Sequence, residues 1–111
     1  MVEVPAAAIA IDLFRKSAFF SIGSNDLTQY VTATSRDASA IAALGDPGHP
    51  AVLRLIEAVS AFGQDHGIPV SLCGDMASET SHLKALVAAG LRSLSVAPSR
   101  VARVKAALAE L

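Results

Sequence analysis

The alternation of short strand-like and helix-like segments is the feature that most constrains the fold of this chain. Each apolar run that suits a strand is followed by a segment with a helical pattern. The strand-like runs are Val2–Val4, Phe19–Ile22, Val70–Leu72 and Leu94–Val96. Repeated β-α units require parallel strands joined by right-handed crossovers. We therefore predict an α/β fold of about four parallel strands with their helices, forming either a small open sheet or half of an eight-stranded (β/α)₈ barrel.

Signals for helix starts and ends separate these strands. Pro5 suits the first turn of a helix that should run to about Lys16. Ser24 or Asn25 can cap a second helix, which should reach about Ala33. The clearest helix follows Pro50, because its apolar residues recur at the i, i+3, i+4, i+7 spacing of one helix face. Those residues are Val52, Leu55, Ile56 and Val59, and Gly67 should end the helix.

The remaining segments are predicted from their glycines and prolines. Residues 34–50 are expected to be mainly loop, with a turn of helix around 40–44. Ser78 is expected to cap a helix that Gly90 stops, and Pro98 to begin the final helix.

Length and composition narrow the class of protein. With 111 residues, the chain is expected to be a single domain over residues 1–111. Hydrophobic residues make up 52%, which suits a packed core and excludes a disordered chain. The net charge of −1 and the absence of a basic cluster argue against nucleic acid as a partner. The longest apolar stretch, near residues 6–13, is too short for a membrane span. A single cysteine excludes an internal disulfide and fits the cytoplasm, where we expect the protein.

Polar residues that could take part in catalysis or ligand binding follow three of the predicted strands. Glu3, Asp26 and Cys73 should look into one cavity, because parallel strands end at one edge of a sheet. Two carboxylates suit Mg²⁺, which prefers oxygen ligands. Asn25 and the N–H groups of the following helix can hold a phosphate, and Arg36 can bind phosphate or carboxylate through its forked guanidinium. Cys73 can act as nucleophile, metal ligand or proton donor.

Each of these residues also has a simpler interpretation. Glu3 is equally suited to an interior salt bridge, and Asp26 next to Asn25 is more often a helix cap. Cys73 alone is typical of an inert buried thiol, and an isolated Arg36 of a solvated surface charge. Three histidines lie away from the strand ends, and we assign them no role in the site: His49, His66 and His82.

Five segments together resemble a known family. They are M-V-E-V-P-A-A-A (Met1–Ala8), F-F-S-I-G-S-N-D-L-T-Q-Y (Phe19–Tyr30), H-P-A-V-L-R-L-I (His49–Ile56), L-C-G-D-M-A-S (Leu72–Ser78) and L-S-V-A-P (Leu94–Pro98). In order and spacing they resemble the phosphoenolpyruvate-binding barrel of enzyme I of the sugar phosphotransferase system, the phosphoenolpyruvate–protein phosphotransferases. Pyruvate phosphate dikinase and phosphoenolpyruvate synthase share the N-D-L-T-Q run, whereas E-V-P-A-A-A favours enzyme I.

The resemblance implies a role for each candidate residue. Glu3 and Asp26 match the family's two Mg²⁺ ligands, and Asp26 also belongs to the substrate-binding set. Asn25 and Arg36 match residues that hold the phosphate of phosphoenolpyruvate. Cys73 matches the acid that protonates the enolate when pyruvate forms. The sequence departs from the family around Arg36, where Ser35 replaces the usual preceding aspartate, and that change bears on how Arg36 is positioned.

The resemblance begins at about the fifth strand of the barrel, so it implies the C-terminal half-barrel alone. No histidine of the chain matches the family's phosphorylated histidine, and we expect the chain not to transfer phosphate by itself. Its expected partners are phosphoenolpyruvate or pyruvate, the missing half-barrel or a second copy, and a phosphocarrier protein only through the full-length enzyme. Three alternatives stay open: a non-catalytic half-barrel that dimerises or docks, a fragment of a synthase- or dikinase-type barrel, and a free-standing metal-dependent lyase acting on carboxylated enolates.

Overall fold

Four extended segments run parallel to one another in the order in which they occur in the chain. The computed structural model describes residues 1–35 and 44–111. Strand β1 (Phe20–Gly23) pairs with β2 (Val70–Cys73), with Ile22 opposite Leu72 and Gly23 opposite Cys73. Val2 forms a parallel bridge to Ile22, and Leu94 forms one to Leu72. This arrangement confirms the predicted α/β class with parallel strands.

The centre of the core lies where these segments cross the molecule. Val2, Ile22, Leu72 and Leu94 stand side by side in register. Ile22 and Leu72 are fully buried, Val2 is nearly so, and Leu94 packs against the same cluster. Both inner strands carry apolar side chains, as expected for parallel strands that helices cover.

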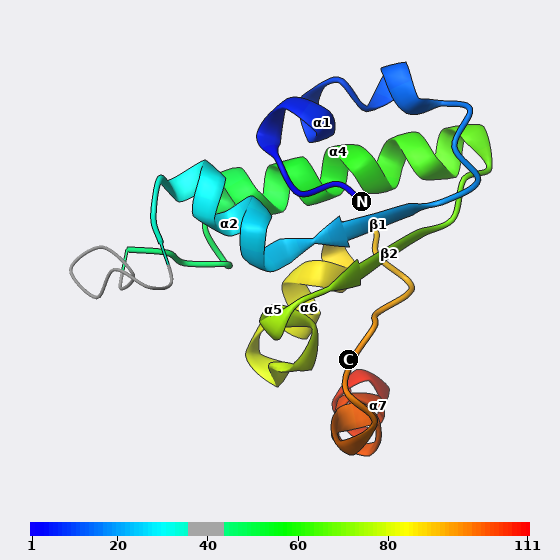
Figure 1. Cartoon of the computed structure of the whole chain (residues 1–111). Helices are drawn as coiled ribbons and strands as arrows, with labels where there is room; N and C mark the ends of the chain where they lie inside the picture. The colour runs from blue at the N-terminus through cyan, green and yellow to red at the C-terminus, as the bar shows by residue number, and fades with distance from the viewer. Residues whose placement is uncertain (36–43) are drawn as a thin grey trace.

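Helices flank the strand pair on both sides in Figure 1. On one side lie α1 (Pro5–Ile9) and α4 (Pro50–His66), which pack against each other. Along the other side follow α5 (Asp75–Ser78), α6 (Thr80–Ala88) and α7 (Val101–Ala109). Helix α2 (Ser24–Thr32) continues directly from β1, and two short 3₁₀ turns complete the described elements, η1 (Ile11–Phe14) and η2 (Pro98–Arg100).

Helix α4 forms as its sequence predicts. Val52, Ile56 and Val59 are buried on one face, and Leu55 is half-buried beside them. His49 caps the helix, since its Nδ1 accepts a hydrogen bond from the Ala51 N–H at 3.0 Å. Gly67 ends the helix with φ of 66°, a left-handed conformation that glycine adopts without steric cost.

Three helix predictions are wrong in detail. The first helix stops at Ile9 and not near Lys16, because the chain changes at Ala10 to a 3₁₀ turn that brings Ile11 into the core. Neither Ser24 nor Asn25 caps α2, whose N-cap is Gly23. Ser78 is the last residue of α5, and Glu79 precedes α6 as its N-cap.

The outer strands are shorter than predicted. Around Val2 and around Leu94, pairing is limited to a single bridge on one side within the described residues. The predicted turn of helix around 40–44 falls mostly on residues 36–43, which lie outside the described part of the chain.

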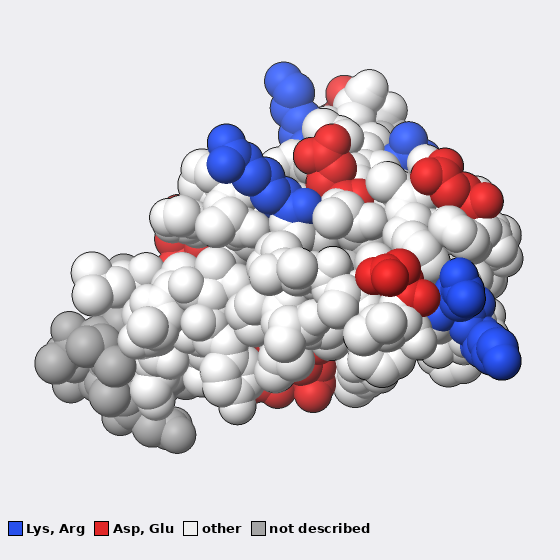
Figure 2. Space-filling model, turned by 90° about the horizontal axis from the view of Figure 1, so that it is seen from above, with Lys and Arg blue, Asp and Glu red and all other residues white. Residues whose placement is uncertain are grey.

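Charged side chains of both signs lie on the surface of the molecule (Figure 2). On the face seen in Figure 2, basic and acidic side chains are interspersed and no basic patch forms. Within residues 1–35 and 44–111, no helix combines the length and the apolar character that crossing a membrane requires.

Candidate functional site

The polar residues singled out in the sequence lie at the carboxyl ends of the parallel segments. Glu3 follows Val2, Ser24 to Asp26 follow β1, and Cys73 is the last residue of β2. Because the segments are parallel and in register, these residues share one edge of the sheet. Carboxyl ends of parallel strands are where α/β enzymes place their ligands.

Glu3 is positioned by the glycine that ends the neighbouring strand. Its half-buried side chain lies over Gly23, so a Cβ at that glycine would stand 2.7 Å from Glu3 Cγ and 3.0 Å from Glu3 Oε1. The backbone of Gly23 has φ of −87°, which any residue can adopt. Glycine is therefore required here for space: without a side chain, it lets the Glu3 carboxylate lie across the end of β1.

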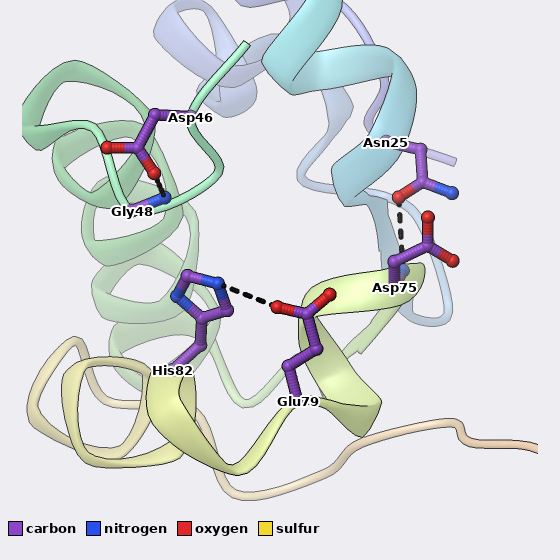
Figure 3. A network of polar contacts seen from close by, with 6 residues as sticks. All are labelled: Asn25, Asp46, Gly48, Asp75, Glu79 and His82. Carbon is purple, nitrogen blue, oxygen red and sulfur yellow. Dashed lines mark hydrogen bonds and ion pairs between the residues drawn. The ribbon is translucent and has the colours of Figure 1, made fainter. Parts of the chain in front are cut away.

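Three hydrogen bonds join the end of β1 to the end of β2. The Ser24 hydroxyl donates to the Cys73 carbonyl at 2.6 Å, and the Cys73 thiol donates to the Ile22 carbonyl with Sγ and O 3.6 Å apart. The Asp75 N–H donates to Asn25 Oδ1 at 3.0 Å, as Figure 3 shows. We call this set the strand-end clasp, formed by Ile22, Ser24 and Asn25 on one side and Cys73 and Asp75 on the other.

Gly74 allows the two sides of the clasp to approach. Its φ is 109°, a conformation that disfavours other residues, and a Cβ there would overlap Ser24 Oγ and lie 3.0 Å from Asn25 Oδ1. The bond from the Asp75 N–H also fixes the orientation of the Asn25 amide. With Oδ1 engaged, the NH₂ group remains available to donate to an anion.

Asp26 and Arg36 differ in how far the structure describes them. Asp26 is exposed in the first turn of α2, and its carboxylate has no hydrogen bond or salt bridge to any described residue. Its exposure leaves it accessible to a cation. Arg36 lies outside the described residues.

A cleft of about 320 Å³ adjoins the clasp on the side of Asn25 and Asp75. Its walls come from α2, the 44–49 segment and the start of α5, and it is lined by Asn25, Thr28, Gln29, Thr34, Ser35, Gly45, Pro47, Asp75, Met76 and Glu79. On its rim, Glu79 Oε2 lies 3.2 Å from His82 Nε2, so the side chain of one of the three unassigned histidines contacts a carboxylate beside the cleft (Figure 3).

The expectation of one cavity shared by three side chains is met only in part. Glu3, Asp26 and Cys73 belong to the same edge of the sheet, yet they do not line the cleft that Asn25 lines. Across the described part of the chain, His, Cys, Asp and Glu side chains nowhere gather in a group of three or more that could hold a metal ion.

Sequence reasoning missed the contribution of Ser24, Gly74 and the Asp75 N–H. Ser24 was considered a helix cap, but its hydroxyl bonds to a residue 49 positions away. The available signal was Gly74 directly after Cys73, because a glycine next to a reactive residue indicates a close approach of another segment.

Comparison with known proteins gives consistent results over the whole chain. A sequence model of the family described as "PEP-utilising enzyme, PEP-binding domain", where PEP is phosphoenolpyruvate, matches residues 1–111. Phosphoenolpyruvate-protein phosphotransferases are 45% identical in Cupriavidus necator and 48% identical in Borreliella burgdorferi, each over 95% of this chain and 18% of the relative. A phosphoenolpyruvate synthase of Pyrococcus furiosus is 42% identical over 99% of this chain and 14% of the relative.

These relatives are much longer proteins. The chain spans less than a fifth of the length of each of the three. The match nevertheless extends from the first residue to the last, and it includes the strand ends where Glu3, Asn25, Asp26 and Cys73 lie. The chain therefore belongs to the family of phosphoenolpyruvate-utilising enzymes and corresponds to their phosphoenolpyruvate-binding domain.

Proposed function

We propose that this chain is the C-terminal half of the (β/α)₈ barrel of a phosphoenolpyruvate–protein phosphotransferase of the sugar phosphotransferase system. Two observations support the half-barrel. Parallel segments follow one another in chain order, as in a barrel, and the outermost of them, at Val2 and Leu94, each pair on one side only within the described residues. The names of the relatives at 45% and 48% identity support the phosphotransferase.

The proposed activity belongs to the longer protein. The bond between phosphorus and the enol oxygen of phosphoenolpyruvate breaks, and a bond between phosphorus and a histidine nitrogen of another domain forms. The electron pair stays on the oxygen as the enolate of pyruvate. The Cys73 thiol then donates its proton to the methylene carbon, which gives pyruvate and a thiolate that regains its proton from water.

The geometry of the clasp supports these proposed roles for Asn25 and Cys73. The Asn25 NH₂ group, left available by the bond to Asp75, would donate to an oxygen of the phosphate. The Cys73 thiol points to the Ile22 carbonyl, with Sγ and O 3.6 Å apart, so its side chain is held at the strand end. The observation that carries the proposal is that three hydrogen bonds hold the Asn25 amide and the Cys73 thiol at the same edge of the sheet. Arg36, outside the described residues, would add a second contact to the phosphate.

The two carboxylates at this edge support a proposed Mg²⁺ site. Glu3 and Asp26 would hold the ion, since carboxylate oxygens are its preferred protein ligands and water and substrate phosphate commonly complete its shell. The absence of a side chain on Gly23 leaves room for the half-buried Glu3 carboxylate, and Asp26 is exposed to solvent at the start of α2. When bound there, Mg²⁺ would neutralise charge on the phosphate and enolate oxygens.

A titration tests this site without requiring turnover. We expect phosphoenolpyruvate to bind the chain in the presence of Mg²⁺, as measured by isothermal titration calorimetry, and Glu3→Gln or Asp26→Asn to abolish the Mg²⁺-dependent part. The matched controls are Glu57→Gln and Asp65→Asn, which change exposed carboxylates on α4 and should leave binding unchanged. Binding that needs no Mg²⁺, or that survives both substitutions, would contradict the metal assignment. We also expect no pyruvate release by the isolated chain.

Location and protein partners follow from the same proposal. A phosphotransferase of this kind would act in the cytoplasm and would meet its phosphocarrier protein only as the full-length enzyme. The other half of the barrel, or a second copy of this chain, would cover the outer segments.

A different branch of the same family is the second candidate. The relative from Pyrococcus furiosus is named a phosphoenolpyruvate synthase, and its 42% identity is close to that of the phosphotransferases. An assay for phosphate transfer from phosphoenolpyruvate to a phosphocarrier protein by the full-length enzyme would separate the two, because only the phosphotransferase is expected to perform it.

A further inference from the structure

The Ser24 hydroxyl is buried between the two strand ends. Ser24 is 1% exposed although it is the first residue of a helix, a position that usually faces solvent. Its hydroxyl makes no capping bond within α2 and donates instead to the Cys73 carbonyl at 2.6 Å. The space beside the Cys73–Gly74 peptide is filled by this oxygen, since a Cβ on Gly74 would overlap it.

These contacts leave Cys73 little freedom. Its backbone pairs with β1 opposite Gly23, its carbonyl accepts from Ser24, and its thiol points to the Ile22 carbonyl. Two residues further along the chain, the Asp75 N–H donates a hydrogen bond to Asn25 Oδ1. Within the clasp, the Ser24 bond is the one that holds the peptide immediately following the thiol-bearing residue.

We propose that Ser24 is a positioning residue for the Cys73 thiol, acting through the Cys73 carbonyl. The inference rests on the proposed function only in treating the thiol as a proton donor. The geometric part stands on the hydrogen bonds alone. When the Ser24 hydroxyl is removed, the 73–75 turn loosens and the thiol leaves the Ile22 carbonyl.

The chain offers a direct assay, because Cys73 is its one cysteine. Alkylation by iodoacetamide under native conditions, followed by intact mass, reports the accessibility and freedom of that thiol without phosphoenolpyruvate or Mg²⁺. We expect Ser24→Ala to raise the alkylation rate about fivefold, the factor that corresponds to the loss of one ordinary hydrogen bond. Ser24→Thr retains a hydroxyl and should restore a rate within about twofold of the wild type.

Two control variants separate positioning from stability. Ser60 is 3% exposed and its hydroxyl has no hydrogen-bond partner among the described residues, so Ser60→Ala removes a comparably buried hydroxyl from a place away from the clasp. It should leave the rate unchanged. Gly63→Ala destabilises the packing of α4. Its alkylation rate shows how much a loss of stability alone increases alkylation. Urea denaturation gives the free energy of unfolding of each variant for this comparison.

The outcomes decide the proposal in either direction. A Ser24→Ala rate above that of Gly63→Ala at equal or smaller loss of stability supports it, and recovery in Ser24→Thr strengthens it. An unchanged rate, or one that stability alone accounts for, overturns it. If Ser24→Thr fails to fold, the comparison of Ser24→Ala with the two controls still decides. Failure of the proposed function would appear separately, as a lack of phosphoenolpyruvate binding in a chain whose alkylation behaves as expected.

Discussion

At the scale of single residues, the most informative positions are those where a missing or small side chain makes room for a functional one. Gly23 makes room for Glu3, and Gly74 makes room for Ser24 and Asn25. Gly23 is the last residue of β1 and Gly74 directly follows β2. At both positions a neighbouring segment can therefore approach the backbone closely. The candidate site therefore depends on two residues that carry no chemistry of their own.

Gly23→Ala should weaken Mg²⁺ binding without unfolding the protein. The backbone at Gly23 tolerates alanine, but the added Cβ would stand 2.7 Å from Glu3 Cγ and push the carboxylate aside. We expect the Kd for Mg²⁺ to rise about tenfold, which corresponds to roughly 1.4 kcal/mol. Calorimetric titration with Mg²⁺ measures this, and urea unfolding checks the fold. An unchanged Kd would mean that Glu3 does not bind the ion from its position over Gly23.

Ser60→Ala should stabilise the protein. The Ser60 hydroxyl is buried without a hydrogen-bond partner in the described part of the chain, and burial of an unpaired hydroxyl is costly. Alanine removes the group and leaves the backbone of α4 unchanged, so we expect a gain of about 1 kcal/mol in the free energy of unfolding. Urea denaturation measures it, and a clear loss of stability would indicate that the hydroxyl has a partner, such as a buried water.

The residue types at the site could be predicted from the sequence, but their contacts could not. The sequence predicts Glu3, Asp26 and Cys73 at one edge because parallel strands end together, and they lie there. Their roles as ligands and proton donor stay predictions. The bond from Ser24 to Cys73 joins residues 49 positions apart, and local propensity favours the same serine as a helix cap. Tertiary contact overrides that propensity here.

At the scale of elements, a glycine lets α4 pack closely against the start of β2. Gly63 faces Ile68 and Val70, which follow the turn at Gly67 that ends the helix. A periodic apolar face and a glycine end were enough to predict α4 from sequence. The outer strands could not be predicted to shrink to single bridges, since strand length depends on neighbours that the sequence of the strand does not specify.

Gly63→Ala should destabilise this contact by a steric clash, whereas Gly67→Ala should destabilise it by straining the backbone. A Cβ on Gly63 would lie 2.6 Å from the Ile68 carbonyl oxygen, a backbone atom that cannot rotate away, so we expect a loss of about 2 to 3 kcal/mol. Gly67 has nothing within 4 Å but a φ of 66°, and alanine there should cost about 1 kcal/mol. Urea unfolding of both variants measures the difference. Equal losses would show that packing at Gly63 is softer than its geometry indicates.

At the scale of the whole molecule, the described chain leaves apolar side chains exposed near its first residues. Met1, Phe14 and Phe19 line one hollow of about 90 Å³, and their exposed fractions are 72%, 46% and 65%. The neighbouring Val2 is the outermost of the parallel segments at this end and pairs on one side within the described residues. Apolar groups beside an incompletely paired sheet edge favour association with another chain.

We therefore expect the isolated chain to self-associate through this end. Sedimentation velocity over a range of protein concentrations should show a dimer or larger species. The double substitution Phe14→Ser with Phe19→Ser should shift the distribution towards the monomer, because it removes the two exposed phenylalanine side chains that line the hollow. Tyr30→Ser is the matched control: Tyr30 is also 65% exposed, but it lies on α2 away from the hollow, and its loss should leave the distribution unchanged. A wild-type chain that stays monomeric at every concentration would show that these exposed apolar side chains do not drive association. The non-catalytic docking module would then lose its main support, whereas the proposed ligand site at the opposite ends of the strands would be unaffected.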